Sequence, residues 1–119
     1  MKSNNKITGN RGEELAAEFL SQKSYRLVER NFRTRFGEID IISYDGPILV
    51  FVEVKTKIGH DFGEPEEMVN KSKIAKVKRM GEVYLQEKKL DVGCRVDVVA
   101  IVMENSGSVE KLEHYQAVY

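Results

Sequence analysis

Two carboxylates and a lysine occupy two neighbouring segments that both have the character of β-strands. Asp40 lies in Gly-Glu-Ile-Asp-Ile-Ile (residues 37–42), and Glu53 and Lys55 lie in Val-Phe-Val-Glu-Val-Lys (residues 50–55). Side chains alternate along a strand, so Glu53 and Lys55 point to the same face. An Asp-Gly pair between the segments predicts a hairpin turn that brings Asp40 close to Glu53. Such a group suits either a divalent cation with an activated water or a buried salt bridge, and these residues alone leave both interpretations open.

Length and composition fit one compact domain. The chain has 119 residues, 41% of them hydrophobic, with 19 basic and 19 acidic side chains. The balanced charge neither favours nor excludes nucleic acid, although residues 1–35 carry eight Lys/Arg against four Asp/Glu. Cys94 is the single cysteine, so an intrachain disulfide is excluded, and no Cys/His cluster suggests structural zinc. Because neither a signal peptide nor a membrane-spanning run is apparent, we expect a cytoplasmic protein without a membrane partner.

Hydrophobic periodicity predicts two helices and five strands in the order αβββαββ. Helices are expected over residues 11–23, after a loose segment at residues 1–9 with Asn10 as N-cap, and over residues 66–88. Strands are expected over residues 25–33, 37–44, 48–57, 95–103 and 109–115. The helical crossover before the fourth strand predicts that it runs parallel to the third. The expected fold class is α/β, a mixed central sheet of about five strands flanked by helices.

Several short motifs occur in the same order as in a known bacterial family. They are Gly12-Glu13, Glu-Arg-Asn-Phe-Arg (29–33), Gly-Glu-Ile-Asp (37–40), Phe-Val-Glu-Val-Lys-Thr (51–56), Lys73, Arg-Val-Asp-Val-Val-Ala (95–100) and His114. On these residues the chain resembles the YraN-like proteins over nearly its whole length. That family is similar in fold to the PD-(D/E)XK, restriction-endonuclease-like nucleases, which include the archaeal Holliday-junction resolvases. The resemblance implies one such domain over residues 1–119, and it is more specific for the family than for an activity.

The resemblance implies a role for each member of the acidic group. Asp40 and Glu53 match the two metal-binding acids of the superfamily, and Lys55 matches its catalytic lysine. Glu13 matches a helical acid that can complete the metal shell, although its spacing from Asn10 also fits a capping box at the helix start. Mg²⁺, or alternatively Mn²⁺, prefers such oxygen ligands, stabilises charge on a phosphate and makes water more acidic. Lys55 would orient that water or offset the phosphate charge.

Further polar residues are expected near this group. Five basic side chains are expected to contact a nucleic-acid backbone: Arg33, Arg35, Lys57, Lys73 and Lys76. Lys73 lies beside the apolar stripe of its helix, where it either reaches the acidic residues or covers the core. Glu38 shares a strand face with Asp40 and is either a further ligand or an ion-pair partner of Arg33 or Arg35.

Other candidates have weaker signals. Arg95 and Asp97 share a strand face, where a structural ion pair is expected. His60 is typical of a surface loop, and His114 matches the family pattern without an assigned mechanism. The aromatic residues are scattered, without the alternation of bases and aromatics that stacks single strands, so backbone and shape are expected to dominate recognition.

The expected function is metal-dependent hydrolysis of DNA phosphodiester bonds, with branched or damaged DNA as the substrate suggested by the resolvases. Two alternatives remain open: a nucleic-acid-binding module without catalysis, and a protein-interaction subunit that retains the nuclease fold. Since resolvases act as symmetric dimers, a homodimer is compatible with the resemblance, but no sequence stripe identifies its interface.

Overall fold

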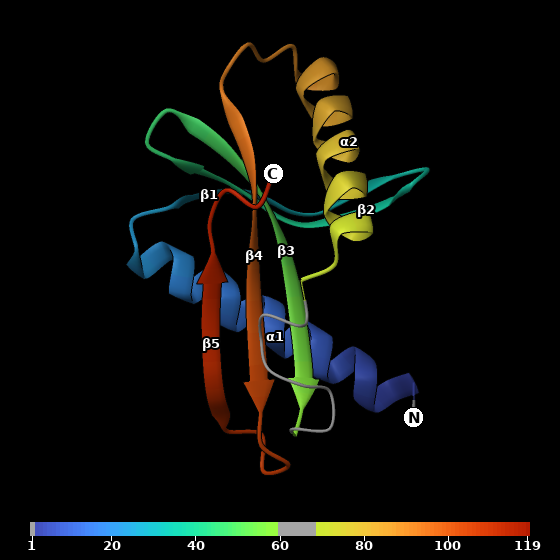
Figure 1. Ribbon diagram of the computed structural model, residues 1–119, viewed down its shortest axis with the longest axis vertical. Helices are drawn as coiled ribbons and strands as arrows, with labels where there is room; N and C mark the ends of the chain where they lie inside the picture. The colour runs from blue at the N-terminus through green and yellow to red at the C-terminus, as the bar shows by residue number, and fades with distance from the viewer. Residues whose placement is uncertain (1, 60–68) are drawn as a thin grey trace.

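The computed structural model describes residues 2–59 and 69–119, which form two helices and five strands (Figure 1). In chain order these are α1 (Lys2–Gln22), β1 (Arg26–Thr34), β2 (Gly37–Asp45), β3 (Ile48–Ile58), α2 (Lys71–Lys88), β4 (Cys94–Met103) and β5 (Val109–Tyr115). The sheet has the order β1-β2-β3-β4-β5, in which β3 and β4 are parallel and the other neighbours antiparallel. The predicted α/β class, element order and parallel crossover are confirmed.

The two helices cover opposite faces of the sheet, and each face has its own core (Figure 1). The core on the α2 side includes the buried residues that recur at helical spacing on that helix: Ile74, Val77, Met80 and Tyr84. The core on the α1 side contains Ala16 and Leu20 of that helix. Consecutive residues of β3 alternate between the cores, with Phe51 in the first and Val50 and Val52 in the second. This explains why β3 is apolar on almost every residue before Glu53.

Helix α2 begins later than predicted. Asn70 has an extended backbone, and its side chain accepts a hydrogen bond of 3.1 Å from the Lys73 N–H, so it caps a helix that starts at Lys71. The predicted start at residue 66 is therefore wrong, while residues 66–68 lie outside the described part of the chain. Within the described residues, neither helix combines the length and the apolar character needed to cross a bilayer.

Helix α1 is longer than predicted, because it begins at Lys2 rather than near residue 11. The expected loose segment is wrong for residues 2–9, and so is the N-cap role of Asn10, while Met1 lies outside the described residues. Gly9 and Asn10 are poor helix formers, which is why the sequence indicated a boundary there, but propensity is a weak prior that tertiary packing overrides. Glu13 consequently lies far inside the helix, and the capping-box alternative for this residue is also wrong.

Gly12 determines how closely α1 packs on the sheet. A Cβ atom at this position would overlap Oγ1 of Thr56 on β3, and no side chain larger than hydrogen fits between the two elements. The close approach places the adjacent residue, Glu13, directly beside the sheet. The glycine that weakens the helix locally is thus the residue that allows it to position an acid.

Strand β2 separates from β3 at Asp40. The β2–β3 ladder runs from Asp45 and Ile48 to Ile41 and Val52. Beyond that point β2 continues to pair with β1, as far as Gly37 and Thr34. The far end of the β1–β2 hairpin therefore extends past α2, whereas β3 continues beside β4 (Figure 1). The outer strand β1 is itself irregular, with a bulge between Leu27 and Glu29.

Candidate functional site

Three carboxylates meet where β2 separates from β3. Glu13 extends from α1, and Glu38 and Asp40 extend from β2, with one oxygen of each lying within 4.8 Å of the others. We call these residues the acidic cluster. Among residues 2–59 and 69–119, it is the one group of histidine, cysteine and acidic side chains spaced for a shared metal ion. Glu13 and Asp40 are both ligands that the family resemblance implies, and a further ligand is one of the two alternatives for Glu38.

Asn31 connects two members of the acidic cluster. Its Nδ2 donates hydrogen bonds of 2.8 Å to Oε1 of both Glu13 and Glu38. The residue has a left-handed backbone (φ 55°), a conformation for which asparagine is enriched among non-glycine residues. Arg30, the preceding residue, adds a cation 3.8 Å from Glu13 Oε1. The sequence analysis assigned no role to Asn31, although an asparagine inside an otherwise regular strand is a signal of an irregular backbone.

Glu53 lies beside the acidic cluster on β3 and is only 5% exposed. Its Oε1 is 3.8 Å from the Lys73 ammonium of α2 and 4.0 Å from the Lys55 ammonium of β3. Its Oε2 is buried and has no hydrogen-bond partner among the residues that the structure describes. Leaving a buried carboxylate oxygen unpaired costs free energy, and a ligand bound to this oxygen would offset that cost. Of the two placements weighed for Lys73, the structure has the one that reaches the acids.

The electrostatics of these acids favour a bound cation. Burial and the negative charge of Glu53 raise the pKa of Asp40 to about 7. Burial also raises the pKa of Glu53, even though Lys73 and Lys55 act in the opposite direction. Ionised carboxylates this close to one another repel, and a divalent cation would relieve the repulsion. Hard carboxylate oxygens and one unpaired buried oxygen therefore fit Mg²⁺ or Mn²⁺.

The site draws residues from both layers of helices. Glu13 comes from the layer of α1 and Lys73 from the layer of α2, yet both influence the pKa of Glu53. They can do so because the sheet is open between β2 and β3 beyond Asp40. Glu53 and Lys55, predicted to share a face of β3, do lie together at this opening.

The remaining predicted nucleic-acid contacts are distributed over the β1–β2 hairpin, β3 and α2. Arg33 forms an ion pair of 3.3 Å with Glu38, one of the two alternatives weighed for Glu38. Lys57 is half-buried near the end of β3. Arg35 and Lys76 lie at the tip of the β1–β2 hairpin and on the facing side of α2. His60 lies outside the described residues.

A second buried polar network is centred on Asp97 of β4. Its carboxylate is 0% exposed and has hydrogen bonds with four groups: Tyr25 Oη (3.1 Å), Arg95 Nε (3.0 Å), His114 Nε2 (2.8 Å) and Ala117 N–H (3.0 Å). Burial alone would raise the pKa of Asp97, but the hydrogen bonds from His114 and Arg95 outweigh it and lower the pKa to about 2. The predicted ion pair of Arg95 and Asp97 is confirmed. His114 belongs to this network, with a side chain only 3% exposed.

Comparisons with known proteins point to one family. The sequence model of "Uncharacterised protein family UPF0102" matches residues 12–101. A UPF0102 protein of Dictyoglomus turgidum is 42% identical over 112 residues, covering 93% of this chain and 95% of that protein. A UPF0102 protein of Geobacter sulfurreducens is 44% identical over 111 residues, covering 92% and 86% of the two chains. The matched segment contains the whole acidic cluster together with Glu53 and Lys55, whereas His114 lies beyond it.

Proposed function

Because the chain belongs to the UPF0102 family of YraN-like proteins, and because carboxylates and lysines converge where β2 separates from β3, we propose that it is a metal-dependent nuclease. The proposed substrate is DNA, whose phosphodiester bonds are hydrolysed, and the proposed fold assignment is restriction-endonuclease-like. The observation that carries the proposal is the buried, unpaired Oε2 of Glu53 beside three further carboxylates. Most buried polar side-chain atoms have a hydrogen-bond partner, so an unpaired carboxylate oxygen beside further carboxylates supports a ligand site.

Asp40 and Glu53 would hold the cation, Mg²⁺ or Mn²⁺, together with Glu13. Glu38 is placed to serve as a further ligand or to orient Glu13 through Asn31. When bound, the cation stabilises the negative charge that develops on the phosphate and lowers the pKa of water. Ligand binding would also satisfy the unpaired oxygen of Glu53.

The two lysines have different tasks in this proposal. Lys55 is 32% exposed, so its ammonium can reach both Glu53 and an incoming phosphate. It would donate a hydrogen bond to the attacking water or to a non-bridging phosphate oxygen. Lys73 is a positioning residue, because its charge lowers the pKa of the buried Glu53 and so opposes the effect of burial.

The test is a cleavage assay with junction, flap, single-stranded and duplex DNA in Mg²⁺ or Mn²⁺. We expect wild-type protein to cleave at least one of these substrates, and Asp40→Asn, Glu53→Gln and Lys55→Ala to lose at least about a hundredfold in rate. Glu82→Gln is the matched control, because Glu82 is an exposed acid on α2 that pairs only with Lys78 at 3.7 Å among the ion pairs of the described residues. Its rate should equal that of wild type.

Two outcomes would contradict the proposal that the protein is a nuclease. The first is no cleavage by wild type across the whole panel, and the second is equal cleavage by wild type and Glu53→Gln. Salt-dependent DNA binding that survives Asp40→Ala and Lys55→Ala without turnover would instead indicate a non-catalytic binding module. A stable protein partner with no DNA binding at low salt would indicate an interaction subunit.

A further inference from the structure

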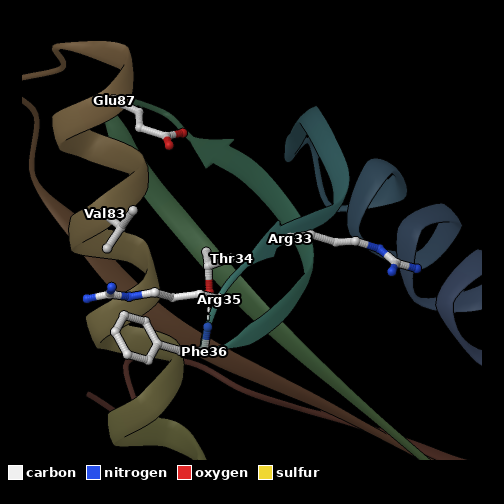
Figure 2. Close-up of a pocket in the computed structure, with 6 residues that line it drawn as sticks. All are labelled: Arg33, Thr34, Arg35, Phe36, Val83 and Glu87. Carbon is white, nitrogen blue, oxygen red and sulfur yellow. Dashed lines mark hydrogen bonds between the residues drawn. The ribbon is translucent and has the colours of Figure 1, made fainter.

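A hollow of about 510 Å³ lies between the tip of the β1–β2 hairpin and α2. It is lined by Arg33, Thr34, Arg35, Phe36, Val83 and Glu87 (Figure 2). A smaller hollow of about 310 Å³ is also bordered by Phe36 and is otherwise lined by Ser72, Ala75, Lys76 and Arg79. Neither hollow is lined by a member of the acidic cluster itself.

Phe36 is an exposed aromatic ring on a fixed turn. The ring is 37% exposed, although it lies within the part of the chain that packs on α2. Thr34 Oγ1 accepts a hydrogen bond of 3.0 Å from the Phe36 N–H and donates one of 3.1 Å to the Gly37 carbonyl. Gly37 itself has φ of +139°, which only glycine adopts readily. These contacts fix the backbone from which the ring extends before any ligand arrives.

Cations surround this ring. The Arg35 guanidinium lies 4.8 Å from the ring centroid, and the two side chains lie side by side against α2 in Figure 2. Lys76 and Arg79 approach from α2, and a Cβ placed on Gly37 would lie 3.6 Å from Cε of Lys76. Glu87 is the one acid among the residues that line the two hollows. The surface is therefore suited to an anionic partner that also presents a flat face.

The surface is continuous with the acidic cluster. Arg33 extends away from the Phe36 ring in Figure 2 and pairs with Glu38. Asp40 is four positions after Phe36 along the hairpin, and four steps of a strand span about 13 Å at most. One nucleic-acid strand can therefore contact both places.

We propose that Phe36, flanked by Arg35, Lys76 and Arg79, stacks an unpaired base of a DNA strand whose backbone passes the acidic cluster. This inference rests on the proposed function and specifies its substrate class as DNA with unpaired nucleotides. A base offers its π-face only where it is not stacked in a duplex, and stacking on a protein aromatic is tolerant of sequence. The basic side chains next to the ring would contact the phosphates on either side of that base.

The test measures stacking without cleavage. Full-length protein in EDTA is titrated into a flap oligonucleotide that carries 2-aminopurine at its unpaired position, and both anisotropy and 2-aminopurine fluorescence are recorded. Wild type should bind and change the fluorescence, and Phe36→Trp should do so at least as strongly. Phe36→Leu, which keeps apolar bulk without a ring, should bind about tenfold more weakly and lose the fluorescence change.

Tyr119→Leu is the matched control, because Tyr119 is 59% exposed and has the Lys78 ammonium 5.0 Å from its ring. It removes an exposed aromatic–cation pair elsewhere, and its binding should match that of wild type. Equal fluorescence changes for wild type and Phe36→Leu, equal affinity for flap and continuous duplex, or no DNA binding would each overturn the inference. Tighter binding of a polyglutamate peptide than of the oligonucleotide would also overturn it and assign the surface to an acidic peptide.

The two proposals fail in distinguishable ways. If the protein never cleaves DNA but changes the fluorescence in a way that depends on the ring, the nuclease proposal is contradicted and the stacking proposal is supported. If the protein cleaves DNA with metal but Phe36→Leu has no effect on binding, the stacking proposal is contradicted and the nuclease proposal is supported.

Discussion

The Asp40 carboxylate accepts a hydrogen bond of 2.8 Å from the backbone N–H of Val54. The β2–β3 ladder has already ended at Ile41 and Val52, so this N–H has lost its neighbouring strand. A partly buried N–H without a partner would be costly, and the side chain supplies the missing acceptor. Asp40 therefore closes the end of the ladder and also belongs to the acidic cluster, and these two tasks can be separated by mutation.

Asp40→Asn and Asp40→Ala should differ in stability. Asparagine keeps a carbonyl acceptor for the Val54 N–H. It also replaces a carboxylate whose raised pKa means that its ionised form is unfavourable in the folded chain, so this variant should be at least as stable as wild type at pH 8. Alanine leaves the N–H unpaired and should lower the free energy of unfolding by about 1–3 kcal/mol. Urea unfolding at pH 8 in EDTA measures both, and two equally stable variants would contradict this role of the hydrogen bond.

The stability of the metal-free protein should fall as pH rises from about 4 to about 7. The pKa of Asp40 is about 7 in the folded chain against an ordinary value of 3.8. The folded state therefore binds more protons than the unfolded state in this window, and unfolding becomes easier as Asp40 ionises. The pKa difference limits the loss to about 4 kcal/mol. Urea unfolding between pH 4 and pH 8 in EDTA should show a steeper decline for wild type than for Asp40→Asn.

A divalent cation should stabilise the folded protein and oppose this decline. Ligand bound only to the folded state adds about 2.7 kcal/mol at a hundred times its dissociation constant. Thermal unfolding with Mn²⁺ should therefore show a higher Tm for wild type than without it. The increase in Tm should be smaller for Glu13→Gln than for wild type, and for Glu82→Gln it should equal that of wild type. Equal increases in all three proteins would place the bound cation elsewhere.

Alanine at two glycines of α1 should have opposite effects. At Gly12 the added Cβ would overlap Thr56 Oγ1, so Gly12→Ala should destabilise the protein by about 1–3 kcal/mol and displace Glu13. At Gly9 nothing lies within 4 Å of the added atom, so Gly9→Ala should stabilise the helix by about 0.5–1 kcal/mol. Adding Thr56→Ala to Gly12→Ala should recover part of the loss. Chemical denaturation of these three variants and wild type checks the set.

Removing the charge of Asp97 should destabilise the protein without a direct effect on the acidic cluster. Asp97→Asn leaves the partly buried Arg95 and the buried His114 with a weaker partner and should cost about 3 kcal/mol or more. Because the pKa of Asp97 is lowered to about 2, its contribution in wild type is present above pH 4 and is lost as pH falls toward 2. Acid unfolding should therefore begin at a higher pH in this variant. In thermal unfolding at neutral pH, the increase in Tm that Mn²⁺ causes in this variant should equal the increase that it causes in wild type.

The strands could be predicted from the sequence because their signals are local. Alternating or continuous apolar runs bounded by glycine and polar residues placed the first four within one residue of their observed ends, and β5 (Val109–Tyr115) at its observed ends. The proximity of Asp40 to the region of Glu53 followed from the short hairpin between the two strands. The helical wheel placed Lys73 beside the apolar stripe, which left contact with the acids as one of two alternatives, and the structure has that contact.

What the sequence did not predict depends on contacts between distant segments. The start of α1 was misplaced because Gly9, Asn10 and Gly12 resemble a boundary until the packing of Gly12 on Thr56 is known. The role of Asn31 requires the left-handed backbone that joins Glu13 to Glu38. In the sequence Phe36 is one of several scattered aromatic residues. Only the folded hairpin shows that it lies between Arg35 and the basic side of α2.

The bulge between Leu27 and Glu29 has a consequence for self-association. β1 is an edge strand of the sheet, and its exposed Leu27 and Val28 would otherwise offer an apolar template for β-addition by a second chain. The bulge and the left-handed Asn31 interrupt the regular spacing of its outward N–H and C=O groups. Continuous intermolecular strand pairing along β1 is thereby discouraged, which protects the protein from edge-to-edge aggregation.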